Sequence, residues 1–105
     1  MENDDIFVVL TPIELLVSLD RERWNLIINV KHPVMKDREN DVQETLLFPD
    51  EIRKSKSDDS VYLFYRRERL SRWTCVIVKQ TNGEGFVITT YPTDSIKEGE
   101  RVWIK

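Results

Sequence analysis

The stretch Gly85-Phe86-Val87-Ile88-Thr89-Thr90-Tyr91-Pro92-Thr93-Asp94 decides the fold predicted for this chain. Read as a β-strand, its successive side chains alternate between the two faces of a sheet. One set is expected to face the core: Phe86, Ile88 and Thr90. The other set is expected on the opposite face: Val87, Thr89 and Tyr91. A hydroxyl and a phenol would then lie about 6 to 7 Å apart along the strand, where both could contact one ligand, although Thr and Tyr are also simply good strand formers.

The residues before this strand predict two helices followed by a meander of antiparallel strands. The helices are expected from Asp20, an N-cap residue, to His32-Pro33, and from Arg38 to Phe48. Strands are expected at 51–55, 61–66 and 72–80, and the turn 81–85 leads into the opening stretch. A short hairpin of 6–10 and 15–19 is expected before the helices. Together they predict an α+β fold, with helices on one face of the sheet and the other face open.

The chain has 105 residues and a net charge of −3, which fits one small domain over 1–105 with its own core. Its single cysteine, Cys75, lies in an apolar run and is expected to be buried. With no cysteine pair and no cysteine–histidine cluster, we expect no disulfide, no metal and no cofactor. The acidic start and the lack of a long apolar run predict a cytoplasmic protein without a membrane span.

The charges are distributed unevenly along the chain. Residues 53–72 hold seven basic and three acidic residues, whereas residues 1–52 hold five basic and twelve acidic ones. A basic segment in an acidic protein is a candidate surface for nucleic acid, and a solvated loop decorated with Lys and Arg gives the same pattern.

The single histidine, His32, lies at a predicted helix end in front of Pro33. A lone histidine is most often structural, but an imidazole with nearby cations and hydroxyls is also sufficient for phosphodiester cleavage without a metal. The imidazole would move a proton near neutral pH, and Arg or Lys would stabilise the charge of the transition state. Strand alternation puts Tyr65 and Arg53 on the face that carries Thr89 and Tyr91.

Seven short segments, in this order, resemble the signature of a nuclease superfamily: HPVM (32–35), DVQETL (41–46), PDEIR (49–53), VYLFYR (61–66), CVIVK (75–79), GEGF (83–86) and ITTY (88–91). The chain thereby resembles the barnase–EndoU–colicin–RelE-like superfamily of small nucleases, in particular its phage-associated and toxin-like branches. The resemblance covers about residues 17–103 and leaves 1–16 as an N-terminal extension or hairpin. It implies N-terminal helices packed on one face of a four-stranded antiparallel β-sheet, and metal-independent cleavage of RNA.

Carried onto this sequence, the resemblance makes His32 the acid or base, and makes Arg53 and Lys79 the phosphate-binding or charge-stabilising groups. Thr89 and Tyr91 would position the scissile group. Tyr65 and Arg66 are predicted to contact RNA. Two positions depart from the signature: Val34, where the family often has Glu, and Thr90, where it often has Ala. The first departure removes a second acid or base.

These observations predict a metal-independent endoribonuclease, the toxin-like component of a toxin–antitoxin or phage-associated system. Its partners would be RNA and a cognate antitoxin or another protein. The alternative is a non-catalytic module that keeps the fold and binds protein or RNA, so enzymatic activity itself stays open. The N-terminal extension could cover a sheet edge, bind a partner or form a homodimer.

Overall fold

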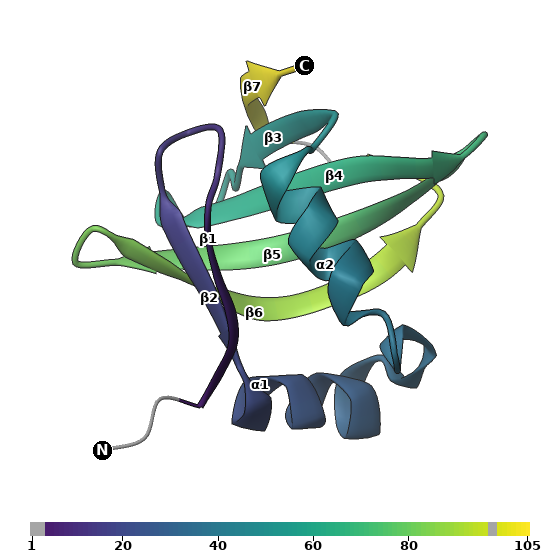
Figure 1. Ribbon diagram of the computed structural model, residues 1–105. Helices are drawn as coiled ribbons and strands as arrows, with labels where there is room; N and C mark the ends of the chain where they lie inside the picture. The colour runs from purple at the N-terminus through teal and green to yellow at the C-terminus, as the bar shows by residue number, and fades with distance from the viewer. Residues whose placement is uncertain (1–3, 97–98) are drawn as a thin grey trace.

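In the computed structural model, which describes residues 4–96 and 99–105, the chain is built around one large sheet with helices on one of its faces (Figure 1). The elements are, in chain order, β1 Asp5–Leu10, β2 Leu16–Asp20, α1 Arg21–Leu26, the π-helical segment η1 Ile27–Lys31, the 3-10 turn η2 Pro33–Met35, α2 Glu39–Leu47, β3 Glu51–Lys54, β4 Val61–Arg69, β5 Arg72–Thr81, β6 Glu84–Thr93 and β7 Glu100–Ile104. The strand order across the sheet is β1-β2-β6-β5-β4-β3-β7. We call the face away from α2 the open face.

The predicted four-stranded antiparallel sheet under N-terminal helices is wrong, because the sheet has seven described strands and is mixed. The N-terminal hairpin joins it through a parallel pair of β2 and β6, in which Val17 lies opposite Gly85. The expected polar tail supplies a further strand, since β7 pairs with β3 and places Trp103 opposite Ile52. Both additions pair strands that are far apart along the chain, which local periodicity does not reveal.

The first helical region begins and ends at the predicted residues. The Asp20 carboxylate accepts a hydrogen bond of 2.7 Å from the Arg23 backbone N–H, so it caps α1. Trp24 and Ile27 turn inward and are fully or almost fully buried. The backbone N–H of His32 still donates to the Ile27 carbonyl, and Pro33 then opens the short turn η2. His32 is therefore held at a fixed point between two helical segments.

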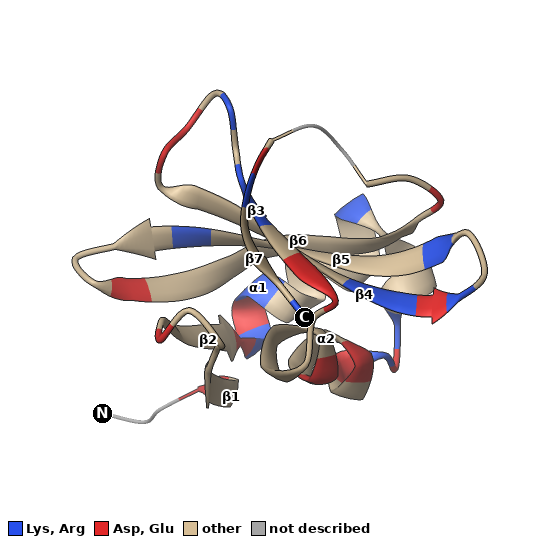
Figure 2. Cartoon of the chain, turned by 90° about the horizontal axis from the view of Figure 1, so that it is seen from above, with Lys and Arg blue, Asp and Glu red and all other residues tan. Residues whose placement is uncertain are grey.

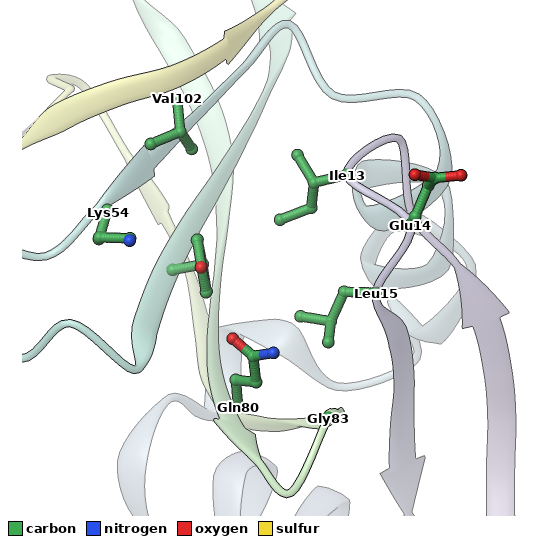
Figure 3. A pocket seen from close by; sticks show the side chains of 8 residues that line it. Ile13, Glu14, Leu15, Lys54, Gln80, Gly83 and Val102 are labelled. Atoms are coloured by element: carbon green, nitrogen blue, oxygen red, sulfur yellow. The ribbon is translucent and has the colours of Figure 1, made fainter.

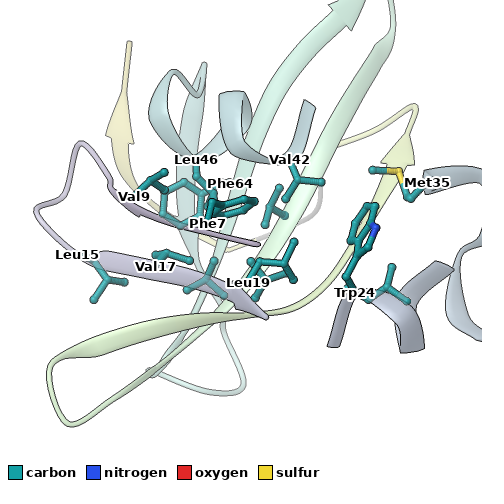
Figure 4. Close-up of a cluster of buried hydrophobic side chains, with 14 of the residues drawn as sticks. Phe7, Val9, Leu15, Val17, Leu19, Trp24, Met35, Val42, Leu46 and Phe64 are labelled. Atoms are coloured by element: carbon teal, nitrogen blue, oxygen red, sulfur yellow. The ribbon is translucent and has the colours of Figure 1, made fainter. Parts of the chain in front are cut away.

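The main core lies between the sheet and the helices (Figure 4). From α2, Val42 and Leu46 are completely buried, and they pack in the same cluster as Phe64 of β4. The hairpin of β1 and β2 adds its own inward-facing side chains: Phe7, Val9, Val17 and Leu19. Burial of this many apolar side chains is the main favourable contribution to folding.

The alternation predicted for 85–94 is correct only in its second half. Thr90 is buried, and Thr89 and Tyr91 lie on the open face, as expected. Earlier in β6 the faces are reversed, with Val87 in the core and Phe86 39% exposed. The pairing of β5 with β6 shifts between Thr89 and Val87, so Ile88 is an extra residue in a β-bulge. A bulge inserts one residue into the strand. The side chains before the bulge therefore point to the opposite faces from those that the alternation after it would predict.

Candidate functional site

The middle of the open face carries a second, smaller apolar cluster. It consists of Leu63, Tyr65 and Cys75, with Ile96 from the connection between β6 and β7 packed against it. Tyr65 and Cys75 are completely buried, so neither side chain is available to a large ligand. The predicted stacking of RNA on Tyr65 would need this cluster to open. Burial of Cys75 as a small apolar group is confirmed.

His32 and Tyr91 are brought together at the edge of the sheet. Their ring centroids are 5.2 Å apart, with the planes tilted by 42°. Tyr91 lies directly opposite Cys75 on the open face, and both His32 and Tyr91 are half-buried. Burial raises the pKa of the Tyr91 phenol above its ordinary value, and the neighbouring Cys75 and Tyr65 raise it further. The phenol therefore stays protonated at neutral pH, and its hydrogen bond with the Cys75 side chain orients it on the open face.

The two predicted catalytic cations lie elsewhere on the sheet. Arg53 is on β3, separated from β6 by three strand spacings or about 14 Å. Its guanidinium pairs with the Glu51 carboxylate at 2.6 Å and donates to the Gly99 carbonyl at 3.3 Å. Arg53 thus holds the start of β7 against β3, and the structure does not bring it to His32.

Lys79 is also engaged in an ion pair. It lies four residues along β5 from the position opposite Tyr91, a distance of about 13 Å. Its ammonium contacts the Asp58 carboxylate at 3.0 Å. Hydrogen bonds from the Ser60 hydroxyl and backbone N–H, with Lys79 beside them, lower the pKa of Asp58 from 3.8 to about 2. This pair fixes the β3–β4 loop at one end of the open face.

Thr89 and Arg66 have different surroundings. The Thr89 hydroxyl oxygen is buried and has no hydrogen-bond partner among the described residues. It lies on the open face, two residues from Tyr91. Arg66 is opposite Thr74 and faces α2, where its guanidinium is 3.9 Å from the Glu44 carboxylate. Thr89 therefore shares the face of Tyr91 but does not expose its hydroxyl to a ligand, whereas Arg66 belongs to the other face.

Two residues that the sequence did not single out complete the open face at this end. Trp73 on β5 lies opposite both Arg67 on β4 and Thr93 on β6. The Arg67 guanidinium lies over the Trp73 ring, 6.0 Å from its centroid. We call the four side chains His32, Arg67, Trp73 and Tyr91 the aromatic platform. The available signal in the sequence was an Arg and an aromatic residue placed symmetrically on either side of a tight hairpin turn, where the two strands bring them opposite each other.

The platform lies beside a cationic part of the surface. Lys and Arg gather along the β4–β5 hairpin, whereas α2 on the other side of the sheet is mostly acidic (Figure 2). On the hairpin, Glu68 is paired with Arg38 and lies 3.6 Å from Arg72. Of the hairpin's charges, Arg67 and Arg69 have no carboxylate partner at their guanidinium groups within the described residues. The basic segment 53–72 is thus divided between β3 and the β4–β5 hairpin. Only its C-terminal part, on the hairpin, forms this cationic surface.

No family model, curated protein or solved structure matches this chain. The resemblance to the nuclease superfamily stays a prediction. Within residues 4–96 and 99–105, no group of three or more His, Cys, Asp or Glu side chains is placed to hold a metal ion. None of the helices described is long and apolar enough to cross a membrane.

Proposed function

We propose that this chain binds single-stranded RNA on the aromatic platform. The observation that supports the proposal is the placement of Arg67 over Trp73 on the same face as Tyr91 and His32. Proteins that bind single strands use aromatic rings to stack on bases and cations to contact phosphates. The proposal includes a cytoplasmic location, where such RNA is available.

The spacing of the platform suits a single strand. Trp73 is opposite Thr93, and Tyr91 is two residues from Thr93 on the same strand. Such diagonal neighbours are about 7 to 8 Å apart, so their two rings can contact adjacent parts of one flexible ligand. A rigid duplex buries its bases and would offer these rings only its backbone. We therefore expect single strands to bind more tightly than duplexes of the same sequence.

Replacing Arg67 by Gln is expected to weaken the dependence of RNA affinity on salt. Loss of one phosphate contact lowers the slope of log affinity against log salt by about 0.7 for a single strand. The measurement is fluorescence anisotropy of a short labelled RNA over a salt series. Arg21→Gln, which removes an exposed arginine from α1, is the matched control and should leave the slope unchanged. Equal slopes for wild type and Arg67→Gln would refute a phosphate contact at Arg67.

Replacing Trp73 by Ala is expected to weaken RNA binding about 5- to 150-fold, because stacking on an aromatic ring contributes about 1–3 kcal/mol per base. The matched control is Phe86→Ala, since Phe86 is an exposed aromatic residue of the same sheet on the other side of the bulge. Both variants are titrated with the same RNA after circular dichroism has shown that they are folded. An identical loss in the two variants would mean that the platform is not the binding site.

Cleavage of the bound RNA is the second candidate function, and the contact of His32 with Tyr91 favours it. An imidazole can take the proton of a ribose 2′-hydroxyl or give one to the leaving oxygen, and the protonated phenol could donate to a phosphate oxygen. In this form the protein would be a toxin-like endoribonuclease, with an antitoxin as its protein partner. Incubation of RNA with saturating protein in EDTA separates the candidates. Intact RNA supports binding alone, and fragments support cleavage.

A further inference from the structure

A cavity of about 340 Å³ lies on the helix side of the sheet, away from the aromatic platform (Figure 3). The β1–β2 loop forms one wall through Ile13 and Leu15, and Tyr62 and Val102 contribute from β4 and β7. Ile13 and Tyr62 pack against the main core, so the cavity is an extension of the core that opens to solvent. Its size is within the range of cavities that hold small organic ligands.

The cavity contains a cation for which the described residues provide no counter-ion. The Lys54 side chain points into it, and the ammonium lies 5.6 Å from the centroid of the Tyr62 ring (Figure 3). No described carboxylate lies within ion-pair distance of this ammonium, in contrast to the paired Arg53 next to it. Glu14 is at the rim, but its carboxylate points away from the interior. A half-buried ammonium in such surroundings attracts an anion.

A second polar group limits the chemistry further. The Gln80 side-chain amide points into the cavity from β5 (Figure 3). An amide can donate to or accept from a ligand, so it can orient one without adding charge. Four apolar or aromatic side chains, Ile13, Leu15, Tyr62 and Val102, also line the cavity, so a ligand with a flat or hydrophobic part can pack against them.

We propose that this cavity binds a small organic anion. Its carboxylate or phosphate would contact Lys54, and its apolar, flat body would pack against Tyr62 and Leu15. Gln80 would hydrogen-bond to a polar atom of that body. The site lies on the other face of the sheet from the aromatic platform and does not depend on RNA binding.

Indole-3-acetate is a probe with this chemistry, and 3-methylindole is its neutral counterpart. We expect indole-3-acetate to shift the amide resonances of Leu15, Gln80 and Gly83 in a titration of ¹⁵N-labelled protein. Lys54→Gln should weaken indole-3-acetate about 10-fold or more, as expected for loss of a charged contact, and leave 3-methylindole within about twofold. Phenyl phosphate titrated in parallel distinguishes a phosphate from a carboxylate as the preferred anion.

Lys36→Gln is the matched control, because Lys36 is an exposed lysine of another surface. It should bind indole-3-acetate as the wild type does. The amide spectrum of each variant reports directly whether it is folded. Gln80→Leu is a second variant, which keeps the charge of Lys54 and is also expected to weaken the binding of indole-3-acetate. Shifts confined to other residues, no saturable shift, or equal affinity of wild type and Lys54→Gln for indole-3-acetate would overturn the proposal.

Discussion

Replacing Phe64 by Ala is expected to lower the free energy of unfolding by about 3–5 kcal/mol, the usual cost of removing a buried aromatic side chain. Phe64 is completely buried in the main core (Figure 4). It belongs to the same cluster as Val42 and Leu46 of α2. The cavity left behind would be enclosed between sheet and helix, where neighbouring side chains have little room to collapse into it. A small domain is stable by only about 5–15 kcal/mol, so this variant loses a large share of that margin.

The measurement is urea unfolding followed by circular dichroism at one temperature. Phe48→Ala is the matched control, since it makes the same chemical change at a side chain that is 64% exposed. That variant should remain within about 0.5 kcal/mol of the wild type. Similar losses for the two variants would show that Phe64 is not enclosed as described.

For the cleavage candidate, replacing His32 by Ala is expected to reduce the cleavage rate by about 10²- to 10⁴-fold, the usual contribution of a general acid or base. His32 is the chain's single histidine, and its ring contacts that of Tyr91 on the open face. Among the other side chains of the aromatic platform, Trp73 has no titratable group, and burial raises the pKa of the Tyr91 phenol and keeps it protonated, so neither can replace the imidazole as a base. The assay is cleavage of labelled RNA in EDTA, read by gel electrophoresis.

Two further variants make the result specific. Lys31→Ala removes the exposed neighbouring cation and should cleave nearly as fast as the wild type. Tyr91→Phe keeps the ring beside His32 but removes the hydroxyl, so it separates ring packing from hydrogen-bond donation by the phenol. Cleavage that persists in a folded His32→Ala variant, or that is seen only with added magnesium, would exclude His32 as the acid or base.

Local signals in the sequence predicted the individual helices and most of the strands. Asp20 caps α1, Pro33 follows the end of η1, and the turn around Gly83 joins β5 to β6. These features depend on a few neighbouring residues, whose backbone preferences are strong. The assembly of the sheet was not predictable in the same way, because the pairing of β2 with β6 and of β3 with β7 joins distant segments.

The candidate site was predicted only in part, for a related reason. Thr89 and Tyr91 share a face because they are two residues apart, which the sequence shows directly. The approach of His32 to Tyr91 depends on where η1 meets the edge of the sheet, and Arg53 and Lys79 are held elsewhere by Glu51 and Asp58. The bulge at Ile88 also has no clear local signal, although it reverses the faces of β6.

The parallel pairing of β2 with β6 has a consequence for the order in which the protein folds. The β1–β2 hairpin and β6, the strand that pairs with its inner edge, are separated by most of the described chain. Closing so long a loop is entropically costly, and folds rich in such contacts form slowly. Until β6 is in place, the inner edge of β2 has no strand to pair with, and Val17 lacks its contact with Gly85. We therefore expect the docking of the β1–β2 hairpin on β6 to be a late step of folding, after β4, β5 and β6 have paired.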